Sequence, residues 1–159
     1  MTSAKFLRAI ILAALAIVSV TAMARDVVPI VDYIDTPIVT TTGKPVTSAQ
    51  VANAITAAAI AYKWDVAKSP SQELLVATLR VNNKHTVIVS IPYSPQSFSI
   101  KYQDSINMKF SLAANTGGYE SPDMPKRNNF DSGTRLIHPY YNKWVQQLRS
   151  AILSELRRL

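Results

Sequence analysis

Apolar residues recur at helical spacing in a segment that begins near residue 47. Thr47 and Gln50 have the spacing of a capping box, and Val46 and Val51 can close over them as a hydrophobic staple. The pattern predicts a helix over residues 48–62. One face of that helix carries the apolar stripe Val51, Ile55, Ala58, Ala59 and Tyr62.

A second helical pattern closes the chain, from Pro139 to Leu159. Proline suits the first turn because its missing N–H would be unpaired there. The apolar stripe is expected to anchor this helix in the core, with polar residues such as Asn142 on the other faces. The anchors are Tyr141, Trp144, Val145 and Leu148, followed by Ile152 and Leu156. We therefore predict that Trp144→Ala unfolds the domain, whereas His138→Ala costs little stability.

Between the helices the pattern changes to alternation of apolar and polar residues, which is typical of strands with one buried face. Residues 73–82, 85–92 and 97–110 show it, the last with an irregularity near Asp104 and Ser105. The connecting turns are short, so neighbouring strands should pair antiparallel. The predicted fold class is α+β: a single domain with a helix, a three-stranded antiparallel meander and a C-terminal helix, both helices on one face of the sheet.

The N-terminus has the pattern of a cleavable signal peptide over residues 1–24. Lys5 and Arg8 precede an uncharged apolar run of 12 residues, and Ala22-Met23-Ala24 has the small-x-small pattern of a cleavage site. The run is shorter than the roughly 20 residues of a transmembrane helix. We expect cleavage after Ala24 and a periplasmic or secreted bacterial protein without a stable membrane span; an uncleaved anchor is the alternative.

Residues 25–46 follow as an extended arm. Pro29, Pro37 and Pro45 exclude a helix and interrupt any central strand, yet the arm is too apolar for a free linker. It is expected to lie along the domain or to add an edge strand. The α+β domain then occupies residues 47–159.

The composition of the chain excludes several kinds of chemistry. The chain has no cysteine, which excludes disulfides, thiol catalysis and lipid attachment through a thiol. It carries 17 Lys and Arg against 10 Asp and Glu, a formal net charge of +7, but the basic residues stand singly or in pairs. Such scatter favours a solvated surface, so nucleic acid is not an expected partner.

A long irregular segment at residues 114–136 separates the last predicted strand from the final helix. It is rich in Gly, Pro and polar residues, and loops of this length are uncommon unless they are functional or disordered. Aromatic and basic side chains occur together in it, a mixture typical of partner surfaces. The candidate binding residues are Tyr119, Met124, Lys126, Arg127 and Phe130, with His138 just beyond the segment.

Patterns for serine hydrolysis are weak. Such an enzyme would combine Ser105 or Ser132 with His138 and an aspartate, Asp104 or Asp131, but neither serine lies in a G-x-S-x-G elbow. The interpretation as polar residues of a strand bend and a loop is favoured, so we expect no catalytic residue.

Other site chemistry is equally weak. Carboxylate pairs for glycoside hydrolysis could come only from Asp104, Glu120, Asp123 and Asp131, most of them in the irregular segment. The two histidines, His85 and His138, and the Asp32-x-x-Asp35 pair do not have the ligand spacing of a zinc or calcium site. We expect no metal and no cofactor.

Three stretches between Trp64 and the C-terminus carry a resemblance. They are HTVIVSIPY, FSIKYQDSINMKF and the I-H-x-x-Y-N-x-W-V-x-x-L start of the final helix, here Ile137, His138, Tyr141, Asn142, Trp144, Val145 and Leu148. With these the chain resembles a group of small exported bacterial proteins and lipoproteins of unknown function. The resemblance implies an α+β domain in the cell envelope and no particular reaction. The chain departs from the group in lacking a lipid-accepting cysteine and in its longer loop.

These features together predict a small binding or accessory protein of the bacterial cell envelope, acting on an envelope protein or polymer. The 114–136 segment and the open face of the sheet are the candidate contact surfaces, and the open face could also pair with a second copy. Two alternatives stay open: a small cell-wall-directed hydrolase, and an inhibitor or toxin-neutralising protein.

Overall fold

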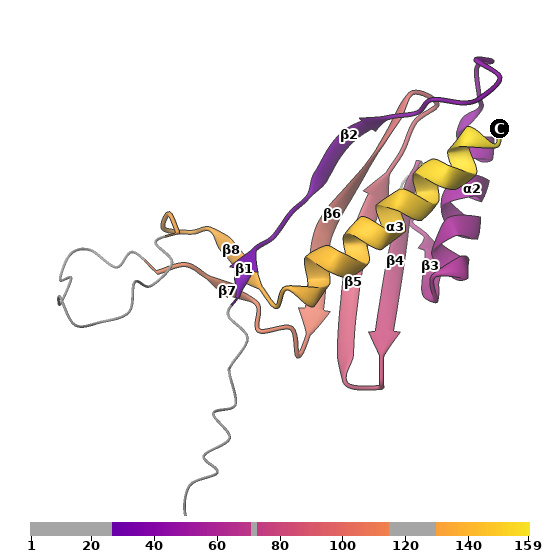
Figure 1. The fold of residues 1–159 in the computed structure, drawn as a ribbon. Helices are drawn as coiled ribbons and strands as arrows, with labels where there is room; N and C mark the ends of the chain where they lie inside the picture. The colour runs from indigo at the N-terminus through magenta and orange to yellow at the C-terminus, as the bar shows by residue number, and fades with distance from the viewer. Residues whose placement is uncertain (1–26, 71–72, 115–129) are drawn as a thin grey trace, which may run out of the picture.

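Two antiparallel sheets and two helices form an α+β fold in the computed structural model, which describes residues 27–70, 73–114 and 130–159 (Figure 1). The strands are β1 (Val28–Pro29), β2 (Tyr33–Pro37), β3 (Trp64–Lys68), β4 (Leu74–Val81), β5 (His85–Pro92), β6 (Ser97–Ile106), β7 (Ser111–Leu112) and β8 (Arg135–Ile137). The helices are α2 (Ser48–Ala61) and α3 (Tyr140–Arg157). The predicted α+β class is confirmed.

The larger sheet has five strands in the order β2-β6-β5-β4-β3, so the predicted three-stranded meander is wrong. β4, β5 and β6 do form a meander, but β3 adds to one edge of it and β2, from the arm, adds to the other. Both edge strands are short, and a bulge interrupts β2 between Tyr33 and Thr36. Neither strand therefore shows the long alternating pattern that predicts the central three.

β6 ends at Ile106 and does not continue to Phe110 as the alternation predicts. Asn107 and Lys109 have positive φ angles of 57° and 54°, which turn the chain out of the sheet. Met108, between them, is thereby directed into the core and is 2% exposed. Its apolar character fits a strand pattern equally well, which explains the error.

Both helices begin close to the predicted positions. At the start of α2 the Thr47 N–H donates to Gln50 Oε1 over 2.9 Å and the Gln50 N–H donates to Thr47 Oγ1 over 3.2 Å, so the capping box forms. α3 follows directly on Pro139. No helix in the described ranges combines the length and apolarity needed to cross a membrane.

The core lies between one face of the five-stranded sheet and the two helices, with α3 crossing in front of the strands in Figure 1. Alternate residues of β4 and β5 are buried, as expected for strands with one covered face. From α3, Tyr141, Val145 and Leu148 are 0% exposed. Trp144 is partly buried at the margin of the core, whereas Trp64 lies within it at 2% exposure.

The smaller sheet has the order β1-β8-β7, and its strands β7 and β8 form a hairpin. Leu112 of β7 is opposite Arg135 of β8, and the Gly133 N–H donates to the Ala113 carbonyl over 2.9 Å. The two ends of the predicted 114–136 loop therefore lie side by side, and its last two residues belong to β8. We call residues 110–113 and 130–136 the hairpin base.

Candidate functional site

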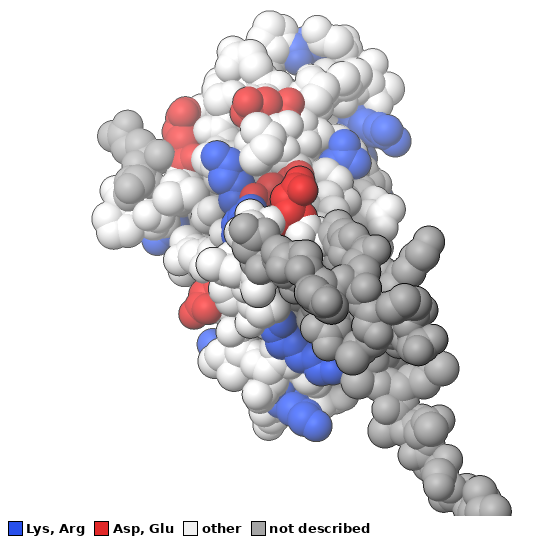
Figure 2. Space-filling view, turned by 90° about the vertical axis from the view of Figure 1, so that its left-hand side faces the viewer, with Lys and Arg blue, Asp and Glu red and all other residues white. Residues whose placement is uncertain are grey.

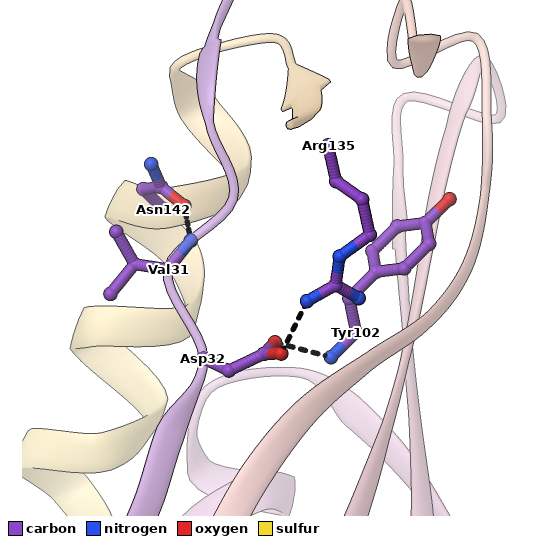
Figure 3. A network of polar contacts seen from close by, with 5 residues as sticks. All are labelled: Val31, Asp32, Tyr102, Arg135 and Asn142. Atoms are coloured by element: carbon purple, nitrogen blue, oxygen red, sulfur yellow. Dashed lines mark hydrogen bonds and ion pairs between the residues drawn. The ribbon is translucent and has the colours of Figure 1, made fainter. Parts of the chain in front are cut away.

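The arm, β6 and β8 meet at Asp32 (Figure 3). Asp32 Oδ1 accepts a hydrogen bond of 2.8 Å from the Tyr102 N–H, and Oδ2 lies 2.6 Å from Nη2 of Arg135. The Asp32 side chain is 19% exposed and that of Arg135 42%, so water screens this pair less than a fully exposed one. Asp32 thereby fixes the arm to β6 and to the hairpin base.

Asn142, in the first turn of α3, binds the arm from the helix side (Figure 3). Its Oδ1 accepts from the Val31 N–H over 3.1 Å, and its Nδ2 donates to the Pro29 carbonyl over 2.8 Å. Both polar groups of the amide thus bond to one short stretch of backbone. The helical pattern assigns Asn142 to an outward face, and this role of the side chain as a clamp is missed by sequence alone.

The contacts of Asp32, Arg135 and Asn142 with the arm, β6 and β8 form what we call the junction. Tyr102 lies at the centre of a group of aromatic rings beside it. Its ring centroid lies 5.0 Å from that of Phe110 in a stacked pair and 5.6 Å from that of Tyr141 in an edge-on pair. The Arg135 guanidinium lies 6.0 Å from the Tyr102 centroid, at the limit of a cation–π contact. The rings connect the hairpin base with the helix that covers the core.

The hydroxyl of Tyr141 is buried at the junction and has no hydrogen-bond partner among the described residues. Burial raises the pKa of Tyr141 well above its usual value of 10.0, and the nearby Asp32 carboxylate raises it further. The hydroxyl therefore stays protonated at neutral pH. An unpaired buried hydroxyl costs about 1–3 kcal/mol, so this group lowers the stability of the junction.

His138 lies just before α3 and participates in the start of the helix. Its Nδ1 accepts from the Tyr140 N–H over 3.2 Å, and its ring centroid lies 4.9 Å from that of Tyr140. In a Ser-His-Asp triad the corresponding Nδ1–H donates to a carboxylate. Here Nδ1 is an acceptor for the backbone, an arrangement that does not match a triad histidine.

The serine and aspartate candidates are engaged in local contacts. The Ser105 hydroxyl lies 3.0 Å from the Tyr102 hydroxyl, and Asp104 Oδ1 accepts from the Ser105 N–H over 2.7 Å. Asp131 and Ser132 are exposed in the hairpin base, while Glu120 and Asp123 lie outside the described residues. Within the described ranges, no three His, Asp or Glu side chains gather as a metal site would require.

Of the candidate binding residues, Phe130 and His138 are described, and both are partly buried. Tyr119, Met124, Lys126 and Arg127 lie outside the described residues. The hairpin base also exposes apolar side chains, with Leu112 at 61% and Phe110 at 44% exposure. Phe110 and Leu112 were not among the predicted binding residues, because the alternation assigns Phe110 to the last predicted strand and Leu112 lies just before the 114–136 segment.

Charged side chains are interspersed on the face drawn in Figure 2. Lys and Arg groups occur over the whole face, some of them next to one another, and Asp and Glu groups lie mainly in its upper half. Both signs of charge are therefore present on the part of this face that the structure describes.

A scan against protein-family models, a search of the curated proteins and a search of the solved structures found no match for this chain.

Proposed function

We propose that this chain is a non-enzymatic binding or accessory protein of the bacterial cell envelope. The signal-peptide pattern of residues 1–24, with cleavage after Ala24, supports export to the periplasm or the exterior. The resemblance to small exported bacterial proteins, carried by the motif from Ile137 to Leu148, supports the same location. The partner is an envelope protein or polymer.

The observation that carries the proposal is the way the hairpin base is held. Asp32 pairs with Arg135 at one end of it, and the backbones of Ala113 and Gly133 are hydrogen-bonded at the other. Binding segments are commonly presented in this way, as irregular stretches whose ends are fixed on a rigid scaffold. The exposed Leu112 side chain of the hairpin base adds apolar contact area for a partner.

The open face of the five-stranded sheet is the second contact surface in this proposal. Ile106 pairs with Thr86 on that face and is 57% exposed. An exposed apolar side chain in an ordered strand can contact a partner without the cost of ordering the backbone. Pairing of two copies through this face predicts a dimer in sedimentation experiments that Ile106→Lys disrupts.

The main test is capture of a partner from envelope extracts. The intact chain should retain a specific partner, and a variant with residues 117–133 replaced by a short linker should lose it. Unchanged capture by the variant would rule out this segment as the binding surface. Hydrolysis of cell-wall polymer by the purified protein would instead establish the hydrolase alternative.

A point substitution tests whether the hairpin base itself contributes to partner binding. Leu112→Ser should weaken capture, because it removes exposed apolar area beside the segment. Val39→Ser is the matched control, since Val39 is 68% exposed and follows the far end of β2. Equal effects of the two substitutions would contradict a role specific to the hairpin base.

A further inference from the structure

A hollow of about 340 Å³ opens between the C-terminal end of α2, the β4–β5 turn and the first turns of α3. Its volume is within the range of small-molecule sites, near the lower end. It is separate from the hairpin base, and none of its residues was singled out by the sequence as a binding residue. Both tryptophans of the chain, Trp64 and Trp144, line it.

Aromatic side chains form much of the hollow's wall. Trp144 is partly buried and Tyr62 is 49% exposed, so both rings present area to a ligand. Tyr140 packs against Trp144, with ring centroids 5.7 Å apart at 32°, and so limits how the Trp144 ring can turn. A ring that is partly exposed and held by a neighbour, as Trp144 is, is suited to stack on a ligand at little entropic cost.

The charge of the hollow is positive. Lys63 and Arg80 line it, and none of the described residues that line it is acidic. Arg80 is paired with Asp65 at 2.7 Å, but both side chains are exposed, so the pair is screened by water. Among the described residues no carboxylate lies within ion-pair distance of Lys63.

Lys63 also occupies an unusual backbone position. It follows the end of α2 with φ of +64°, a left-handed conformation for which glycine is the common residue at this place in a helix. Replacing it with glycine removes the ammonium group and at the same time suits the backbone. This position therefore allows charge and stability to be separated in one experiment.

We propose that the hollow binds an anionic saccharide. The apolar face of a sugar ring lies against Trp144 and Tyr62, and its carboxylate or phosphate pairs with Lys63 and Arg80 through charge-assisted hydrogen bonds. The side-chain amides of Asn82 and Gln147, which also line the hollow, donate to and accept from ring hydroxyls. A saccharide is favoured over a flat heteroaromatic anion, because the two side-chain amides beside the rings suit several hydroxyl groups better than one planar ring system.

Intrinsic fluorescence tests the proposal directly, since both tryptophans of the protein line the hollow. The purified protein is titrated with trigalacturonate, with glucose 6-phosphate, with uncharged maltotriose and with an adenine nucleotide. At least one of the two anionic sugars should change the emission saturably, and which one does distinguishes carboxylate from phosphate. Maltotriose should bind at least about tenfold more weakly, the loss expected for one charged hydrogen bond. No response to either anionic sugar, equal binding of maltotriose, or tighter binding of the nucleotide overturns the proposal.

Substitutions then locate the site. Lys63→Gly should lower the affinity for the anionic sugar about tenfold or more while the melting temperature is unchanged or raised. Lys101→Gln is the matched control, because Lys101 is an exposed lysine of β6 that does not line the hollow, and it should bind as the unaltered chain does. Full affinity in a folded Lys63→Gly protein, or an equal loss in Lys101→Gln, contradicts the assignment. These outcomes are independent of any envelope partner captured through the hairpin base.

Discussion

The two sheets of this protein depend to different degrees on apolar packing and on polar contacts. The five-stranded sheet packs on α2 and α3 through an apolar core in which Ile55, Val89 and Leu148 are all 0% exposed. The three-stranded sheet contributes only Ile137 of β8 to that core, and Asp32 and Asn142 tie it to the rest of the chain through polar atoms. Loss of a core side chain should therefore unfold the whole chain. Loss of a hydrogen bond or ion pair to the arm should instead release the arm and the hairpin of β7 and β8 locally.

The largest expected effect is on the core side of this comparison. Trp64→Ala should lower the free energy of unfolding by about 3–5 kcal/mol, because Trp64 is 2% exposed among core residues. Trp144→Ala should cost clearly less, since Trp144 is only partly buried. Urea unfolding followed by circular dichroism measures both. A greater loss for Trp144→Ala would restore the prediction made from sequence, in which Trp144 is the essential anchor.

Asn142→Ala tests the polar side. It removes two hydrogen bonds to the arm and should cost about 1–3 kcal/mol. Hydrogen exchange should rise mainly at the Val31 amide and its neighbours in the arm, with protection kept in β4 and β5. Lys143→Ala, at the exposed next position, is the control. A uniform rise in exchange over the whole chain would mean that the arm is not a separate unit.

Tyr141→Phe tests a residue that belongs to the core and has its hydroxyl at the junction. It should raise the free energy of unfolding by about 1 kcal/mol, because the buried hydroxyl has no partner among the described residues. The pKa of Tyr141 is raised in the folded chain, so above about pH 10 only the unfolded chain ionises there and stability falls as pH rises. Urea unfolding between pH 8 and 11 should show a shallower fall for Tyr141→Phe. An unchanged slope would contradict this assignment.

His138→Ala should have the smallest effect. The substitution removes a hydrogen-bond acceptor at the partly exposed start of α3, and the expected loss is below about 1 kcal/mol. Thermal unfolding measures it. A loss as large as that of Asn142→Ala would show that His138 contributes to holding the junction and not only to starting the helix.

The parts of the fold that were predictable share one property: their signal is local. Thr47 and Gln50 are three positions apart and form the capping box they predict. β4 and β5 have 8 residues each, and alternate residues in them are buried, as the alternating pattern predicts. β2 and β3 have 5 residues each, and burial alternates in neither of them. They form because a longer neighbouring strand offers an edge, which a local pattern does not reveal.

The junction was not predictable for the same physical reason. Asp32 and Arg135 are 103 positions apart, and Asn142 bonds to a carbonyl 113 positions away. Nothing in the residues around Asn142 distinguishes a clamp from an ordinary solvated amide on a helix. Only the path of the arm across β6 and β8 brings these groups together.

The arm also sets the order in which the molecule can be assembled. It is synthesised well before β8 and α3, which supply Arg135 and Asn142. Contacts between such distant segments form late in folding, because a long loop must close first. The chain between them must therefore be complete before the arm can dock. A nascent chain lacks these contacts until α3 has been synthesised.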